Sequence, residues 1–103
     1  MRLDLHVHTT ASDGSLSPPE VVGLAADGGL DVLAITDHDT VAGIPAAMDA
    51  AAKISLRLIP GIEVSSTHEG KEYHILGYFV DPQADSIQAH ERNAVEGRES
   101  RMD

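Results

Sequence analysis

Two histidines stand one residue apart near the start of the sequence, within "DLHVHTTASDG" (residues 4–14). Apolar and polar residues alternate from Leu3 to Val7, which is the two-residue period of a β-strand. This period places the imidazoles of His6 and His8 on one face of the strand, where both are able to hold the same metal ion. We therefore predict that the first strand begins a metal site.

Further potential ligands occur at or near the ends of later apolar segments. They are Asp13, His38, Glu63 and His74. Glu63 stands between Ile62 and Val64, and a carboxylate buried there needs a partner. Imidazole and carboxylate ligands suit Zn, Mn or Fe, and a carboxylate such as Glu63 is able to bridge two ions, as in two-metal hydrolases. These residue types favour a mixed nitrogen and oxygen site.

Each of these residues also has a plain structural interpretation. A single histidine beside a strand is more often a surface residue or a satisfied core group than a ligand, and we keep that interpretation for His68 and His90. Asp13 in "SDGS" is typical of a turn, and Asp37 or Asp39 is suited to cap a following helix. The closely spaced histidine pair, together with the four later residues, makes a metal site the simpler explanation.

Hydrophobic patterns divide the sequence into alternating strands and helices. "SPPE" predicts a helix start, with Ser17 as N-cap and Glu20 closing a capping box, and the helix is expected to end at Gly28 and Gly29. The later elements are a buried strand at residues 32–35, a helix over much of 46–53 with Pro45 near its start, a strand in "LRLIPGIEVSS" interrupted by Pro60 and Gly61, and a strand in "KEYHILGYFV" that pairs with it as a hairpin. This order is typical of a parallel α/β protein, in which functional residues collect at the carboxyl ends of the strands.

The tail, residues 84–103, is charged and contains few helix breakers apart from Gly97. Its apolar residues Ile87, Val95 and Met102 follow only a loose helical spacing. We expect a helix whose packing partner is missing.

The composition excludes several classes of function. With 7 basic and 17 acidic residues among 103, the net charge is −10, which opposes a long nucleic-acid surface, although metal ions would supply positive charge for short phosphorylated substrates. The absence of Cys excludes disulfides and thiolate chemistry. No P-loop, GxGxxG or GxSxG motif occurs, and neither does an apolar segment fit for a signal peptide or a membrane span. We expect a soluble, cytoplasmic protein without membrane contact.

Four ordered blocks, "DLHVHTTASDG", "ITDHDT", "IPGIEVSS" and "HILGYF", together resemble the PHP family, the polymerase and histidinol phosphatase domain of metal-dependent phosphoesterases. The match runs from residue 2 to about residue 82. The resemblance implies an α/β fold, the N-terminal part of a distorted (β/α)7 TIM-like barrel, with two or three divalent ions (Mn, Fe or Zn) at the carboxyl ends of its strands. By motif, His6 and His8 would hold one ion with Glu63, Glu63 would bridge to a second held by His74, and Asp13 with His38 would hold a third. Asp37 and Asp39 would contact the ligands or cap a helix.

The similarity is nearest to the branch with 3',5'-nucleoside bisphosphate phosphatases and exonucleases of short RNA. It implies hydrolysis of a phosphate ester of a small nucleotide or short RNA by a metal-activated hydroxide. A helical insertion follows "HILGYF" in that branch, so residues 1–82 would be the barrel part and residues 83–103 the start of the insertion. Arg92, Arg98 and Arg101 are candidates for phosphate contacts, with solvated helix charges as the plainer interpretation.

The sequence ends before the His and Asp ligands that later strands contribute in this family. We therefore expect a fragment of a longer protein, inactive as a 103-residue piece alone. Other functions remain open: a histidinol-phosphate phosphatase, a polymerase-associated exonuclease, or a truncated domain that binds metal without turnover.

Overall fold

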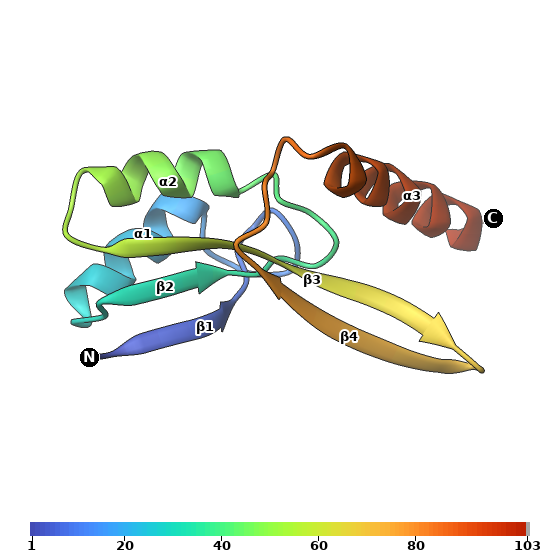
Figure 1. Cartoon of the computed structure of the whole chain (residues 1–103), viewed down its shortest axis with the longest axis horizontal. Coiled ribbons are helices and arrows are strands. Elements are labelled where there is room, and N and C mark those ends of the chain that lie inside the picture. Colours follow the sequence, from blue (N-terminus) through green and yellow to red (C-terminus); the bar gives the residue numbers. More distant parts are fainter. Residues whose placement is uncertain (103) are drawn as a thin grey trace.

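Strands and helices alternate up to the third strand, which is followed directly by a fourth, in the computed structural model, which describes residues 1–102 and the side chains of residues 1–94 (Figure 1). In order the elements are β1 (Leu3–Val7), α1 (Pro18–Asp27), β2 (Val32–Ile35), α2 (Ile44–Ala52), β3 (Arg57–His68), β4 (Lys71–Tyr78) and α3 (Asp85–Met102). The predicted strands and helices are therefore confirmed as elements, although some bounds differ. None of the described helices is long and apolar enough to cross a membrane.

The four strands form one curled sheet in the order β1-β2-β3-β4. β1, β2 and β3 are parallel, whereas β4 returns antiparallel to β3 as the predicted hairpin. The hydroxyl of Tyr78, at the end of β4, donates a hydrogen bond of 2.7 Å to the carbonyl of Leu5 on β1, so the first and last strands are joined directly. The curl and the β/α order confirm the partial TIM-like barrel.

The core lies between the sheet and the two helices that cover one of its faces (Figure 1). β2 supplies Leu33 and Ile35, both almost fully buried, because this short strand has a neighbour on each side. α1 contributes Val22 and α2 contributes Ile44 and Ala47. Burial of each large aliphatic side chain contributes about 1.5–3 kcal/mol, which holds the strands in register beneath the site.

Local chemistry sets where the two helices begin. At α1, the Ser17 hydroxyl accepts a hydrogen bond from the Glu20 amide, and Glu20 Oε1 accepts one from the Ser17 amide, which confirms the capping box. α2 begins at Ile44, two residues before the predicted range, because Pro45 occupies its first turn, where a missing N–H costs nothing.

Pro60 and Gly61 do not interrupt β3, contrary to the prediction. β3 continues through both residues and changes its partner there: Pro60 is the last residue paired with β2, and Gly61 is the first paired with β4. A Cβ atom on Gly61 would lie 2.8 Å from Cγ2 of Thr36 and 3.0 Å from the carbonyl oxygen of Gly77. Gly61 is therefore required by the close approach of the neighbouring strands, and the strand that carries Glu63 stays continuous.

Candidate metal centre

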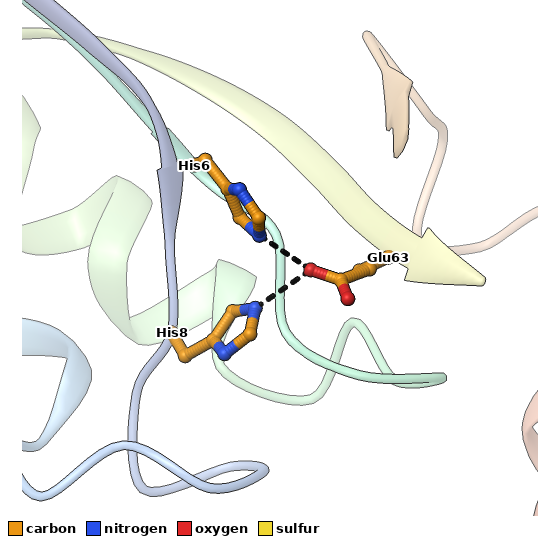
Figure 2. Close-up of side chains that lie close together, drawn as sticks. All are labelled: His6, His8 and Glu63. Carbon is orange, nitrogen blue, oxygen red and sulfur yellow. Dashed lines mark hydrogen bonds and ion pairs between the residues drawn. The ribbon is translucent and has the colours of Figure 1, made fainter. Parts of the chain in front are cut away.

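The carboxylate of Glu63 lies at the centre of a group of four imidazoles. Its Oε1 is 2.5 Å from Nε2 of His6 and 2.9 Å from Nε2 of His8, and Figure 2 shows both rings directed at this one oxygen. Its other oxygen, Oε2, is 3.1 Å from Nδ1 of His74 and 3.3 Å from Nδ1 of His38. The Glu63 side chain is 6% exposed, so these imidazoles replace water around it.

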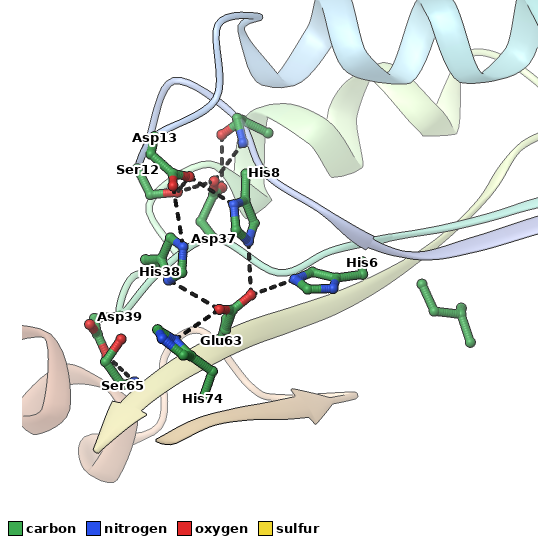
Figure 3. Close-up of polar contacts among 12 residues, drawn as sticks. His6, His8, Ser12, Asp13, Asp37, His38, Asp39, Glu63, Ser65 and His74 are labelled. Carbon is green, nitrogen blue, oxygen red and sulfur yellow. Dashed lines mark hydrogen bonds and ion pairs between the residues drawn. The ribbon is translucent and has the colours of Figure 1, made fainter. Parts of the chain in front are cut away.

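A second carboxylate, Asp13, faces two of the same histidines from the opposite side (Figure 3). Asp13 Oδ1 is 2.7 Å from Nδ1 of His8, and Oδ2 is 3.3 Å from Nε2 of His38. His8 and His38 thus each lie between two carboxylates. The cluster consists of three overlapping groups whose ligand atoms lie within 4.8 Å of one another: His6, His8 and Glu63; His8, Asp13 and His38; and His38, Glu63 and His74. The fold brings all six predicted ligands together.

Parallel pairing explains why these residues meet. His8 directly follows β1 and His38 follows β2, so both lie at the carboxyl edge of the sheet. Beyond the end of β2, His38 and Glu63 form an isolated parallel β-bridge through the backbone. The Glu63 amide donates to the carbonyl of Asp37 at 3.0 Å, and the Asp39 amide donates to the carbonyl of Glu63 at 2.9 Å. The backbone thereby sets two of the candidate ligands side by side.

Asp37 supports the loop that carries Asp13. It is 1% exposed and accepts hydrogen bonds from the Thr9 amide at 2.6 Å, the Thr9 hydroxyl at 2.7 Å and the Ser12 hydroxyl at 2.7 Å. Gly14 closes the same loop, because a Cβ atom there would lie 2.5 Å from the carbonyl oxygen of His8. Gly14 was not predicted to matter for the site, although its place in "SDGS", directly after the candidate ligand Asp13, indicates a tight turn.

Asp39 does not cap α2. Its Oδ1 accepts a hydrogen bond from the Ser65 amide on β3 at 2.9 Å and lies 2.8 Å from Nε2 of His90 on α3 (Figure 3 shows Asp39 and Ser65). His90 is thus a partly buried, hydrogen-bonded residue. His68, with a side chain 75% exposed and Nε2 3.7 Å from Oε1 of Glu69, fits the surface interpretation.

The expectation that the tail helix lacks a packing partner is wrong for its first half. Ile87 packs against the core, and Glu91 Oε2 accepts a hydrogen bond of 2.6 Å from the hydroxyl of Thr40. Of the arginine candidates, Arg92 is exposed on α3, and the side chains of Arg98 and Arg101 lie outside the described residues.

The electrostatics of the cluster favour bound positive charge. Burial would raise the pKa of Glu63, but hydrogen bonds from His8 and His6 and the charge of His38 outweigh it and hold this pKa below its usual value. Burial would lower the pKa of His8, yet the hydrogen bond to Glu63 and the charge of Asp13 raise it. Four imidazoles and two carboxylates converging in this way form a donor set that fits divalent ions such as Zn, Mn or Fe.

The chain is similar to known proteins over most of its length. The PHP domain matches residues 4–90, which include every residue of the cluster. The chain belongs to the PHP domain family. A 5'-3' exoribonuclease of Haemophilus influenzae is 50% identical to this PHP chain over 80 residues, covering 78% of this chain and 29% of that protein. A 3',5'-nucleoside bisphosphate phosphatase of Chromobacterium violaceum is 38% identical over 96 residues, covering 93% of this chain and 34% of that protein.

Two solved structures are similar to almost the whole of this chain. A Chromobacterium violaceum protein described as an amidohydrolase, with bound sulfate and no metal, superimposes with a TM-score of 0.90 at 38% identity, covering 95% of this chain and 34% of that one. A Bifidobacterium adolescentis protein described as a putative metal-dependent phosphoesterase gives a TM-score of 0.84 at 36% identity, covering 90% of this chain and 32% of that one. The PHP chain thus spans about a third of the length of the relatives it matches.

Proposed function

We propose that the protein containing this chain is a metal-dependent phosphoesterase that hydrolyses a phosphate ester of a small nucleotide, such as a 3',5'-nucleoside bisphosphate, or of a short RNA. The observation that carries this proposal is the buried Glu63 carboxylate between the imidazoles of His6, His8, His38 and His74. The names of the two relatives, an exoribonuclease and a nucleoside bisphosphate phosphatase, support this class of substrate.

The six clustered residues would hold two or three divalent ions (Mn, Fe or Zn). His6, His8 and Glu63 form one set of ligands, His38, Glu63 and His74 form a second, and His8, Asp13 and His38 form a third. When bound, the ions would hold phosphate oxygens and lower the pKa of coordinated water. Glu63 belongs to two of these sets, as do His8 and His38, so its carboxylate would serve as a ligand to more than one ion. His74 and Asp13, with side chains 45% and 62% exposed, leave the site open to a substrate from solvent.

Charge also supports a phosphate substrate. The chain carries a net charge of −10, which alone would repel a phosphate ester. Divalent ions at the cluster would reverse the sign of the local charge. The bound sulfate of the related Chromobacterium violaceum structure, an anion similar to phosphate in shape, supports anion binding in such a protein.

The organisation of the chain follows from the same proposal. Residues 1–82 would be the N-terminal part of the barrel, and residues 83–103 would begin a helical insertion near the site. Arg92, Arg98 and Arg101 would then be available for phosphate contacts. We further propose that the protein works in the cytoplasm on small, freely diffusing substrates.

The test is a substrate panel with the longest gene product that contains this sequence. Phosphate or nucleotide release is measured with a 3',5'-nucleoside bisphosphate, a short 5'-phosphorylated RNA and histidinol phosphate, before chelation, after chelation, and after Mn²⁺ is restored. The wild-type protein should act on one of the first two substrates and lose activity on chelation. Preference for histidinol phosphate would favour that alternative activity, and tight metal binding without turnover would favour a non-catalytic domain.

Two variants make the test specific to the site. Glu63→Ala removes the shared ligand and should abolish release. Glu69→Ala removes a carboxylate from the hairpin turn, where the side chain is 85% exposed, and should leave activity unchanged. Near-normal turnover in the Glu63→Ala protein would contradict the proposed role of the cluster.

A further inference from the structure

Helix α3 reaches the candidate site through one of its faces. Ile87, His90 and Glu91 lie three and four positions apart, so they share one side of the helix. Ile87 packs against the hydrophobic core, whereas the two polar residues contact the segment directly after His38. This face anchors α3 on the loop that carries a candidate ligand, although the helix as a whole is strongly polar.

The first polar anchor is the contact between His90 and Asp39. His90 Nε2 lies 2.8 Å from Asp39 Oδ1, and the same oxygen accepts the Ser65 amide at 2.9 Å. The Asp39 amide donates to the carbonyl of Glu63 at 2.9 Å. Asp39 is thus held against β3 by its backbone and its side chain, and against α3 through His90. Its own side chain is only 11% exposed, so no solvent shell replaces these contacts.

The backbone of Asp39 explains why such support is needed. Its φ is 56°, which lies in the left-handed region. This region is unfavourable for residues that have a Cβ atom, although aspartate tolerates it better than most. This conformation turns the chain sharply after His38, and it persists only where surrounding contacts determine it. The hydrogen bonds of the Asp39 carboxylate to β3 and α3 are such contacts.

The second polar anchor lies one residue further along both segments. Glu91 Oε2 accepts hydrogen bonds from the Thr40 hydroxyl at 2.6 Å and from the Val41 amide at 3.2 Å. Val41 is buried, so its amide depends on this carboxylate for a partner. Residues 39–41 are therefore bound to α3 at two successive points, and His38 stands at the end of this fixed stretch.

We propose that His90 is a positioning residue of the candidate metal centre: by holding the Asp39 carboxylate, it fixes the turn that orients His38 between Asp13 and Glu63. The inference rests on the proposed function, because it concerns the same site. It makes the geometry of the centre depend on the docking of α3, a helix that supplies none of the six candidate ligands.

The experiment measures the site directly, without turnover. The longest gene product is chelated and titrated with Co²⁺ alone, whose visible absorption reports the geometry and number of its ligands. Amide hydrogen exchange of Ser65 and Val41 is measured on the metal-free protein. The variants are His90→Ala, which removes the contact, and His90→Gln, which restores an N–H donor at similar reach. His68→Ala is the matched control, because the His68 side chain is 75% exposed on the hairpin and lies 3.7 Å from Glu69, away from the candidate ligands.

In His90→Ala we expect Co²⁺ binding about 10-fold weaker with an altered spectrum, and faster exchange at Ser65. His90→Gln should recover most of the Co²⁺ affinity, the wild-type spectrum and the slow exchange at Ser65. His68→Ala should match wild type in all three measurements. An unchanged spectrum and affinity in folded His90→Ala would overturn the inference while leaving the proposed function in place. If His90→Ala fails to fold, a His90→Gln protein with wild-type exchange but an altered Co²⁺ spectrum would overturn it. A wild-type protein that binds no Co²⁺ would overturn the proposed function as well.

Discussion

Oε1 of Glu63 lies 2.9 Å from Nε2 of His8, although 55 positions separate the two residues in the sequence. One carboxylate in the middle of β3 therefore joins candidate ligands from the first strand to a candidate ligand from β4. Glu63→Gln keeps the size of the side chain and removes its charge. We expect metal affinity to fall by more than the roughly 10- to 100-fold lost when a residue that only supports a ligand is removed.

Calorimetric titration with Mn²⁺ measures this change. Glu69→Gln, in the exposed hairpin turn, is the control and should bind like wild type. Equal affinities for Glu63→Gln and wild type would show that Glu63 is not a shared ligand.

Gly14→Ala should disturb the loop that carries Asp13. The new Cβ would lie 2.5 Å from the carbonyl oxygen of His8 and 2.8 Å from Cα of Thr9, both backbone atoms that cannot rotate away. We expect a loss of stability of about 1–3 kcal/mol together with weaker metal binding. Urea unfolding checks the first and Mn²⁺ titration the second.

Gly23→Ala is the matched control for Gly14→Ala. Gly23 lies within α1, and nothing occupies the space within 4 Å of its added Cβ. Alanine is the better helix former, so this variant should be more stable than wild type by up to about 1 kcal/mol. The same chemical change is thus expected to have opposite signs at the two positions, and a matching loss at both would contradict the explanation by steric conflict.

Asp37→Asn should destabilise the protein without removing a ligand. The carboxylate accepts three hydrogen bonds from Thr9 and Ser12, and an amide in its place has only one acceptor oxygen. A buried donor left without a partner costs about 1–3 kcal/mol. Urea unfolding of the chelated protein measures the loss. Asp27→Asn, at the exposed end of α1, should change stability by less than about 0.5 kcal/mol, and equal effects at both positions would argue against a supporting role for Asp37.

The stability of the metal-free protein should depend on the pH through His8. The pKa of His8 is raised in the folded state, since the hydrogen bond to Glu63 and the charge of Asp13 outweigh burial. Its contribution is therefore fully present below the unfolded pKa of about 6.5 and is lost as the pH rises through the higher folded pKa. For Glu63, whose pKa is lowered, the contribution is present above its unfolded pKa and is lost as the pH falls through the folded one.

Chelated wild type should thus lose more stability between pH 6 and pH 8 than His8→Gln does. Urea unfolding at both pH values compares the two proteins. A loss of the same size in both would show that His8 is not responsible.

Much of the fold could be predicted from local sequence. The limits of β1 and β2 and the start of α1 follow from a two-residue period, a short apolar run and a capping box, each of which depends on neighbours within a few residues. Pro60 and Gly61 were predicted to interrupt β3 because both residues disfavour a central strand. That prediction was wrong because β3 exchanges one partner strand for another at this point, a property of the assembled sheet.

The packing of α3 could not be predicted for a similar reason. Its apolar residues follow only a loose helical spacing, so the pattern does not indicate a continuous apolar face. Its first half docks instead through His90 and Glu91, whose partners Asp39 and Thr40 lie some 50 positions earlier. A hydrogen bond between polar side chains so far apart in the sequence leaves no pattern in the residues around either one.

The candidate ligands could be chosen from the sequence alone, because the closely spaced pair of His6 and His8 is followed by further metal-binding residue types at or near strand ends: Asp13, His38, Glu63 and His74. The sequence also determined the order of strands and helices. The predicted shared position of Glu63 needs no tertiary information beyond its motif, whereas the support of the Asp13 loop by Asp37 and Gly14 and the contact of α3 with Asp39 appear only in the folded chain. The physical reason is that ligand types and periodicity are local properties, whereas a carboxylate gains its partners only when parallel strands bring distant segments to the same edge of the sheet.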